Sequence, residues 1–265
     1  MKTPQFHQIH LPEEFQTIEF LSDLHLDQAH PATFNAWQKY MLNTQTDAIF
    51  ILGDLFESWV GADILNAPSP LGDFERQCAQ VIQKAAEKSS IYIMAGNRDF
   101  LLSQDFAGKT SSTQLTDPTL LSWGENCAII THGDLLCTDD ITYQEYRKMV
   151  NSPIWQQQAL AMPLQQRIQV AQQMRMQSEQ SKQTNSDEIM DANSNTVSSW
   201  MKTAQTTRMI HGHTHHPHHH ILSDNQERIV LSDWHLDTTP EKQKAEILQW
   251  SITDGLKRIS LVNKP

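Results

Sequence analysis

Side chains that could hold divalent metal ions recur in five short motifs along the chain. The motifs are Asp23-Leu24-His25, Gly53-Asp54, Gly96-Asn97-Arg98-Asp99, His132-Gly133-Asp134 and Gly212-His213-Thr214-His215. Carboxylate, amide and imidazole groups form a mixed oxygen and nitrogen set that favours Mn, Fe or Zn over Ca. Cysteine is absent from all five motifs, which argues against a structural zinc site. The candidate ligands are Asp23, His25, Asp54, Asn97, His132, His213 and His215.

The spacing within two of the motifs predicts that paired ligands point into one pocket. Residues i and i+2 of an extended chain face the same side, so Asp23 can act with His25, and His213 with His215. The neighbouring glycines let backbone and metal approach closely. A single motif of this kind is more often a capped turn or a buried core histidine, whereas five in succession indicate a metal centre.

Each motif follows a short apolar run that has the character of a buried strand. Two predicted helices, Ala32–Leu42 and Phe74–Lys88, separate the first of these strands, which is typical of strand-helix-strand units and an α/β fold. In open α/β sheets the loops beyond the carboxyl ends of the strands converge, and ligands bind there. We therefore expect the five motifs to meet at one edge. The apolar runs are Ile18–Leu21, Ala48–Leu52, Ile91–Ala95, Cys127–Thr131 and Arg208–Ile210.

The pattern changes after Asp140 to a long helical segment rich in Gln and Met, with boundaries predicted at Ser152-Pro153 and Met162-Pro163. It lacks strand signals, so we expect an insertion that lies over the sheet. Further strands are predicted at Glu227–Leu231, Ile247–Ile252 and Ile259–Val262, and a solvated loop at His216–His220. The predicted organisation is a catalytic core at 17–139 and 203–265, a helical insertion at 140–202 and an N-terminal extension at 1–16.

Composition and charge argue against several classes of function. The formal net charge of −11 opposes sequence-independent attraction to nucleic acid, so we expect no nucleic-acid partner. The cysteines, Cys78, Cys127 and Cys137, are odd in number and suit reduced thiols better than a disulfide framework. Residues 1–17 lack an apolar signal core, and no run of about 18 apolar residues occurs, so we expect neither a signal peptide nor a membrane span.

The order of the five motifs resembles the calcineurin-like metallophosphoesterase superfamily. That resemblance implies a double β-sandwich flanked by helices and two divalent metal ions. One metal would be held by Asp23, His25, Asp54 and His215, the other by Asp54, Asn97, His132 and His213, with the Asp54 carboxylate bridging. Two cations about 3.5–4 Å apart activate a bound water and stabilise the oxygens of an in-line displacement, so the nucleophile would be a metal-bound water.

The residues after Asn97 indicate which phosphate bond is broken. Arg98 stands beside a ligand, and its planar, permanently charged guanidinium is suited to clamp a phosphate. Protein phosphatases of the superfamily carry a His-acid pair here, which helps to protonate a poor alkoxide leaving group, whereas this chain has Arg98-Asp99. A phosphate leaving group departs without a proton, so the substitution favours a phosphoanhydride substrate.

Longer stretches around the motifs resemble the family of UDP-2,3-diacylglucosamine hydrolases of Gram-negative lipid A biosynthesis. The resemblance covers Ile18 to Leu236 and is most specific in Gly53–Trp59 and His132–Asp140. It implies that water attacks the α-phosphorus of UDP-2,3-diacylglucosamine, giving UMP and 2,3-diacylglucosamine 1-phosphate (lipid X), with Mn²⁺ as the metal. It also implies a peripheral protein on the cytoplasmic face of the inner membrane, and no obligate protein partner is evident.

The resemblance assigns further residues to the substrate. The contacts would come from Asn97, Arg98, Asp140, Ser178, Lys182, Asn185 and His213, although the family's Asn and Lys appear here in the opposite order as Lys182 and Asn185. The insertion would be a lid whose Met, Leu, Ile and Trp side chains line an acyl-chain groove, the alternative being ordinary helix packing. The basic residues expected to face an anionic membrane are Arg147, Lys148, Arg167 and Arg175.

Two other functions remain open from the sequence. The chain could be another dimetal phosphodiesterase or a nucleotide pyrophosphatase that acts on a soluble substrate. It could also be a metal-free interaction scaffold, but such proteins usually lose metal ligands, and this chain keeps the full set.

Overall fold

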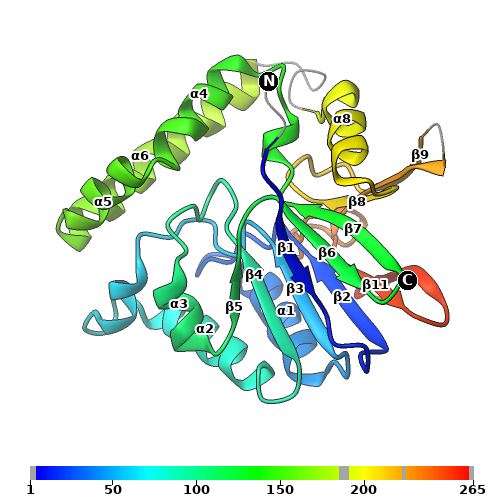
Figure 1. Ribbon diagram of the computed structural model, residues 1–265. Helices are drawn as coiled ribbons and strands as arrows, with labels where there is room; N and C mark the ends of the chain where they lie inside the picture. Colours follow the sequence, from blue (N-terminus) through cyan, green and yellow to red (C-terminus); the bar gives the residue numbers. More distant parts are fainter. Residues whose placement is uncertain (1–3, 185–190, 223–224, 263–265) are drawn as a thin grey trace.

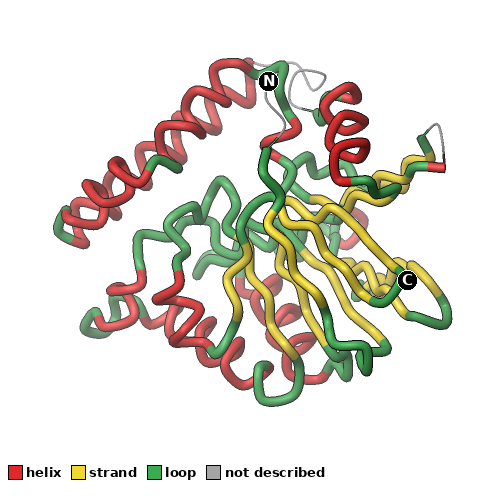
Figure 2. The backbone as a smooth tube through the Cα atoms, viewed as in Figure 1, coloured by secondary structure: helices red, strands yellow, loops and turns green. Residues whose placement is uncertain are grey.

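A computed structural model describes residues 4–184, 191–222 and 225–262. Two six-stranded sheets form the centre of the molecule, and helices cover their outer faces (Figures 1 and 2). The predicted fold class, a double β-sandwich flanked by helices, is therefore confirmed. The strand and helix pattern alone had indicated only an α/β fold.

The first sheet is built mainly from the strand-helix-strand units expected at the start of the chain. Its strand order is β12-β11-β2-β3-β4-β5, with β2 to β5 mutually parallel and β11 and β12 antiparallel at one side. The strands are β2 (Thr17–Leu21), β3 (Ala48–Leu52), β4 (Ser90–Met94), β5 (Thr113–Leu115), β11 (Glu246–Ser251) and β12 (Gly255–Ser260). The helices that connect the parallel strands are α1 (Pro31–Asn43), α2 (Asp73–Ala85) and α3 (Gln104–Thr110).

The second sheet has the order β1-β6-β7-β8-β10-β9. Its edge strand β1 (His7–His10) lies within the predicted N-terminal extension and pairs in parallel with β6. Helix α8 (Ser194–Ala204) packs on the outer face of this sheet through Val197, Trp200 and Met201. The remaining strands are β6 (Thr119–Trp123), β7 (Asn126–Thr131), β8 (Arg208–His211), β9 (His218–Ile221) and β10 (Glu227–Val230).

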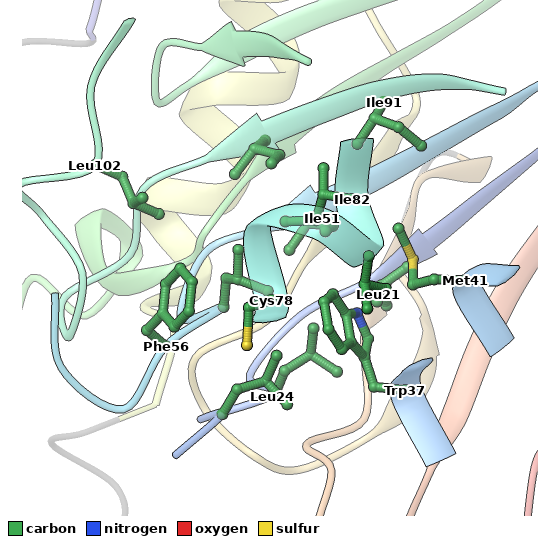
Figure 3. Close-up of a cluster of buried hydrophobic side chains, with 14 of the residues drawn as sticks. Leu21, Leu24, Trp37, Met41, Ile51, Phe56, Cys78, Ile82, Ile91 and Leu102 are labelled. Atoms are coloured by element: carbon green, nitrogen blue, oxygen red, sulfur yellow. The ribbon is translucent and has the colours of Figure 1, made fainter. Parts of the chain in front are cut away.

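Strand β3 explains why the sheets form layers, because all five of its side chains are buried. Ala48, Phe50 and Leu52 face the second sheet, while Ile49 and Ile51 face the helices, as the period of two in a strand requires. Figure 3 shows the helix side of this core, where Trp37 and Cys78 lie among the labelled apolar residues. Each large side chain buried in this way contributes about 1.5–3 kcal/mol.

The insertion begins with helices α4 (Ile141–Val150), α5 (Pro153–Ala161) and α6 (Leu164–Thr184), which extend as an arm from the sandwich (Figure 1). Asp140 caps α4 by accepting a hydrogen bond from the Tyr143 backbone N–H at 2.9 Å. Ser152 caps α5 in the same way, and Pro153 occupies its first turn. The predicted boundaries at Ser152-Pro153 and Met162-Pro163 are confirmed.

Two local predictions were wrong. The last strand was expected at Ile259–Val262, but β12 begins at Gly255, because Gly255 adopts a φ of 70° and closes a tight hairpin with β11. The His-rich run was expected to be a loop, but His218, His219 and His220 pair with β10 as an exposed edge strand.

The remaining elements are short 3₁₀ helices, Ala62–Asn66, Asp134–Leu136 and Pro240–Lys242. Within residues 4–184, 191–222 and 225–262, no helix combines the length and apolar character needed to cross a bilayer.

Candidate metal centre and its pocket

The five motifs leave β2, β3, β4, β7 and β8 at the same end of the two sheets, and backbone hydrogen bonds join their loops. The backbone N–H groups of Asp23 and His25 donate to the carbonyls of Gly53 and Asp54, at 3.1 and 3.0 Å. The backbone N–H of Gly212 donates to His132 O at 2.8 Å across the second sheet. The pairing of the strands thus continues into the loops and fixes the candidate ligands relative to one another.

The backbone at the candidate ligands differs from the extended chain that the sequence suggested. Asp23, His25 and Asp54 have φ values of 53°, 46° and 51°, and His213 and His215 have 69° and 55°. These left-handed conformations are strained for residues other than Gly and cluster at functional sites. Asp23 and His25 both approach His215, as expected of the first pair, but His213 lies with Asn97 instead of with His215. Turned backbone rather than strand alternation aims these side chains.

Two glycines permit the close approach of the ligand loops. A Cβ atom at Gly96 would overlap the carboxylate and backbone nitrogen of Asp54, and one at Gly212 would overlap Ser22 and the carboxylate of Asp23. Neither position tolerates any side chain without displacing a candidate ligand. The glycines in these motifs therefore serve the packing of the site.

Besides Asp54, the six other predicted ligands lie in two groups of three, one on either side of it. On one side, His215 Nε2 lies 3.4 Å from both His25 Nε2 and Asp23 Oδ1. On the other side, Asn97 Oδ1 lies 2.9 Å from both His132 Nε2 and His213 Nδ1. Asp54 Oδ2 is 3.8 Å from His25 Nε2 and 3.8 Å from His132 Nε2. The Asp54 carboxylate is thus placed within reach of both groups.

The polar atoms of the site fit bound cations. Asp23 Oδ1 is buried and, apart from the contact with His215 Nε2 at 3.4 Å, has no hydrogen-bond partner among the described residues. Two sets of three side chains, Asp23-His25-His215 and Asp23-Asp54-His132, place their donor atoms within 4.8 Å of one another. The Asp and His groups of the site are therefore able to bind metal.

The electrostatics of the site also favour added positive charge. Burial alone would lower the pKa of His132, but Asp54, Asp134 and Asp23 outweigh it and raise the pKa to about 9. Burial would likewise raise the pKa of Asp23, yet contact with His215 and nearby imidazoles keeps that pKa far below its usual value. Buried carboxylates that stay ionised demand counter-charge, which divalent cations supply.

Groups outside the ligand set orient the imidazoles. His132 Nδ1 lies 3.0 Å from Leu52 O, and His25 Nδ1 lies 2.9 Å from Glu57 Oε2. Such partners fix the ring orientation and the tautomer of a ligating histidine. Sequence reasoning missed Glu57, although it stands inside the specific stretch Gly53–Trp59. Burial would raise the pKa of Glu57, but contacts with His25 and nearby guanidinium groups lower it to about 2.

Asp99 has a structural position. It is fully buried, and its carboxylate accepts hydrogen bonds from the backbone N–H groups of Gly96 at 2.7 Å and Phe56 at 3.2 Å. It therefore ties the Asn97 loop to the Asp54 loop. Burial and the neighbouring Asp54 charge raise the pKa of Asp99 to about 7.

Arg98 lies between the candidate metal centre and a large pocket. Its backbone N–H donates to Asp54 Oδ1 at 2.8 Å, and its Nη1 lies 3.8 Å from Glu57 Oε1. The Arg98 side chain is largely buried and lines the pocket wall. It is therefore held beside Asp54 and can meet a phosphate there.

The pocket has a volume of about 900 Å³ and joins the candidate metal centre to the insertion. His25, Asp54, Asn97 and His213 line one end, with Asp140 and Ser178 nearby. Lys182 lies in α6, but its side chain is outside the described part of the structure, and Asn185 is outside the described residues. Apolar side chains from core loops and from the insertion also line the pocket, among them Trp59, Val60, Phe100, Leu101, Trp155, Met162, Val170 and Met174.

The predicted basic membrane patch was wrong for two of its members. Arg167 is buried and forms an ion pair with Asp63, and Arg147 lies between Asp134 and Asp117 at 2.7 and 3.0 Å. Both guanidinium groups face core carboxylates rather than a bilayer. Sequence spacing alone could not identify partners that are 104 residues away in the chain, as Asp63 is from Arg167.

The fold agrees with the comparisons to known proteins. The chain belongs to the calcineurin-like phosphoesterases, whose family model matches residues 17–217. Within that class it belongs to the UDP-2,3-diacylglucosamine hydrolase family. It is 41% identical to the protein of that name from Escherichia coli O7:K1, and the alignment covers 86% of this chain and 95% of that protein.

Two further relatives of the same name lead to the same family. The protein from Aromatoleum aromaticum is 40% identical, and the one from Chromohalobacter salexigens is 38% identical. Each alignment covers 82% of this chain and 89% of the relative.

Proposed function

We propose that the chain hydrolyses the pyrophosphate bond of UDP-2,3-diacylglucosamine and releases UMP and 2,3-diacylglucosamine 1-phosphate, as a step of lipid A biosynthesis. The observation that carries this proposal is one pocket whose lining combines candidate metal ligands with apolar side chains of the insertion. The charged diphosphate of the substrate suits the candidate metal ligands, and its two acyl chains suit the apolar side chains. The names of the curated relatives support the same substrate.

Two metal ions, assigned as Mn²⁺, are part of the proposal. Asp23, His25, Asp54 and His215 would hold one, and Asp54, Asn97, His132 and His213 the other. When bound, such cations lower the pKa of a water and offset the charge of the phosphoryl oxygens. The mixed oxygen and nitrogen donors suit Mn²⁺, and metal analysis after purification from the cell tests that choice.

The chain's own residues would position the diphosphate and leave the departing group unprotonated. Arg98 is held beside Asp54 and can clamp a phosphate oxygen through its guanidinium. Asp99 would not act as a general acid, because its carboxylate is buried and engaged with the backbone N–H groups of Gly96 and Phe56. A sugar-phosphate leaving group needs no proton at departure, which fits this arrangement.

The apolar end of the pocket would select the lipid. Trp155 packs edge-on against Phe100 with ring centroids 5.5 Å apart and anchors α5 over the pocket. Met162 and Met174 are unbranched and adapt to flexible chains. Full burial of a side-chain-sized apolar group contributes about 1.5–3 kcal/mol, so two acyl chains would dominate the affinity.

A pair of measurements tests the proposal. Turnover of UDP-2,3-diacylglucosamine should exceed turnover of UDP-glucose by at least about 10²-fold, as the loss of roughly 3 kcal/mol of apolar contact predicts. Reaction in ¹⁸O-labelled water should place the label in UMP, because water attacks the α-phosphorus. Equal turnover would instead indicate a nucleotide pyrophosphatase for soluble substrates, and label in the sugar phosphate would refute attack at the α-phosphorus.

Peripheral docking at the cytoplasmic face of the inner membrane completes the proposal, because the substrate is a membrane lipid. With a net charge of −11, attraction must come from a local surface. Of the seven exposed large apolar side chains in the described residues, five belong to α4, α5 and α6. These five, here called the apolar insertion face, are Ile141, Met149, Ile154, Leu160 and Met176.

A further inference from the structure

Three arginines of the insertion form ion pairs with carboxylates of the core. Arg147 of α4 pairs with Asp134 and Asp117, and Arg167 of α6 pairs with Asp63. Arg175, two turns further along α6, pairs with Glu57 at 2.9 Å between Nε and Oε1. These ion pairs join the insertion to the core, in addition to the packing of Trp155, Leu164 and Ile168 against the core.

The three ion pairs differ in how easily water can replace them. Arg147 is 17% exposed, and its partners Asp134 and Asp117 are 2% and 9% exposed. The Arg167–Asp63 and Arg175–Glu57 pairs each join one buried and one half-exposed side chain, but Arg167 also donates to the backbone carbonyls of Val60 and Met162. Exposed ion pairs contribute little to stability, because water solvates the separated charges well. Arg147 and Arg167 are suited to fixed anchors, and Arg175 is suited to a contact that opens and closes.

Glu57 occupies an unusual position at this third contact. Its backbone N–H donates to Leu26 O at 3.2 Å, so the residue is fixed to the loop that follows Asp23 and His25. Its side chain is only 10% exposed, and Oε2 lies 2.9 Å from His25 Nδ1. The other oxygen, Oε1, lies 2.9 Å from Arg175 Nε and 3.8 Å from Arg98 Nη1. The Glu57 carboxylate thus contacts His25, Arg98 and, from the insertion, Arg175.

We infer that Glu57 is a positioning residue that couples the position of α6 to the positions of His25 and Arg98. The roles of His25 as a metal ligand and of Arg98 as a phosphate-binding residue rest on the proposed function. An ionised carboxylate offers about four acceptor sites and can serve all three partners at once. When the part of α6 around Arg175 moves away while Arg167 stays paired with Asp63, Arg175 leaves and Glu57 keeps His25 and Arg98 as partners. When a substrate phosphate enters, it competes with Glu57 for the two guanidinium groups and draws α6 and Arg98 together.

Binding of Mn²⁺ to the full-length metal-free protein tests whether Glu57 positions His25. Glu57→Ala should weaken Mn²⁺ binding about 10- to 100-fold in isothermal titration, the usual effect of removing the partner of a ligating histidine. Glu57→Gln keeps an acceptor for His25 and should fall between wild type and Glu57→Ala. The matched control is Asp63→Asn, which breaks another core-insertion ion pair and should leave Mn²⁺ affinity within about threefold of wild type. Mn²⁺ affinity within that range in Glu57→Ala would overturn the inference.

Hydrogen exchange at α6 in the Mn²⁺-loaded protein tests whether Glu57 holds α6 through Arg175. Glu57→Gln and Arg175→Gln should each speed exchange around residues 171–178, and the double variant should match either single variant, because both remove one shared contact. Effects that multiply in the double variant, or no change in either single variant, would refute the coupling. Both measurements are independent of the substrate, so a failure of the proposed lipid substrate would leave their outcome unchanged.

Discussion

The two ends of the pocket are built by different means. At the metal end, Asp23, Asp54 and His132 are buried, and loops that pack against glycines hold them in place. At the insertion end, Trp155, Val170 and Met174 are only partly buried and lie on helices that contact the core through ion pairs and a few apolar side chains. The metal end holds individual ligand atoms in fixed positions, while the insertion end provides an apolar surface.

The difference follows from what each end must do. Charge stabilisation in a dry site depends steeply on position, so a displacement of the order of 1 Å is costly. Burial of an acyl chain depends on area and has no direction, so many side-chain arrangements serve equally well. Substitutions should therefore have large effects at the metal end and graded effects at the insertion end.

The largest effect is expected for Asp54→Ala, because one carboxylate would serve both metals and its loss leaves two cations without a bridge. Turnover at saturating Mn²⁺ should fall by at least about 10²-fold, while the far-ultraviolet circular dichroism spectrum stays unchanged. Asp105→Ala, at a carboxylate in the first turn of α3, is the control and should keep wild-type turnover. More than about a tenth of wild-type turnover in Asp54→Ala would refute the two-metal arrangement.

A smaller but distinctive effect is expected from adding one methyl group at Gly96. The new Cβ would push the Asp54 carboxylate away, at a cost of about 1–3 kcal/mol, so turnover should fall about 10-fold or more and bound metal should decrease. Gly108→Ala is the matched control, because nothing lies within 4 Å of a Cβ there. In helix α3 that change should raise the free energy of unfolding by about 0.5–1 kcal/mol without altering turnover. Wild-type metal content in Gly96→Ala would show that the loop tolerates displacement.

At the insertion end, Met174→Ser should lower kcat/KM for UDP-2,3-diacylglucosamine by about 10-fold, because part of the apolar contact of one side chain is lost. Metal content should stay at the wild-type value. Gln173→Ser changes the exposed residue next to it and should leave kcat/KM as it is in wild type. Equal kcat/KM in the two variants would mean that α6 does not contact the acyl chains.

The smallest effect is expected at the apolar insertion face. The double variant Ile154→Ser with Leu160→Ser should weaken binding to anionic phospholipid vesicles about fivefold, since each exposed side chain adds a modest apolar contact. Ile252→Ser removes an exposed apolar residue outside the insertion and serves as the control. Raising the salt to about 0.5 M should change binding little, because apolar contacts are not screened. Unaltered vesicle binding in the double variant would place the docking surface elsewhere.

Much of this protein was determined by the sequence itself. The apolar runs before the motifs predicted β2, β3, β4, β7 and β8, because buried strands have a strong local composition. Proline and serine at the helix starts predicted the division of the insertion into α4, α5 and α6. The types and order of the candidate ligands could also be predicted, since metal chemistry restricts which side chains can act as ligands. Their assignment to two metals stays a prediction.

Only the tertiary structure decided how these parts meet. The pairing of β1 with β6 and the edge strand β9 depend on partners that local patterns do not reveal. Strand alternation predicted how the candidate ligands point, but left-handed backbone at Asp23 and His25 aims these side chains instead, and His213 and His215 lie in different groups. Glu57 and Arg167 look like ordinary charged residues in sequence. Their roles come from partners brought close by packing across the whole chain, which no local spacing encodes.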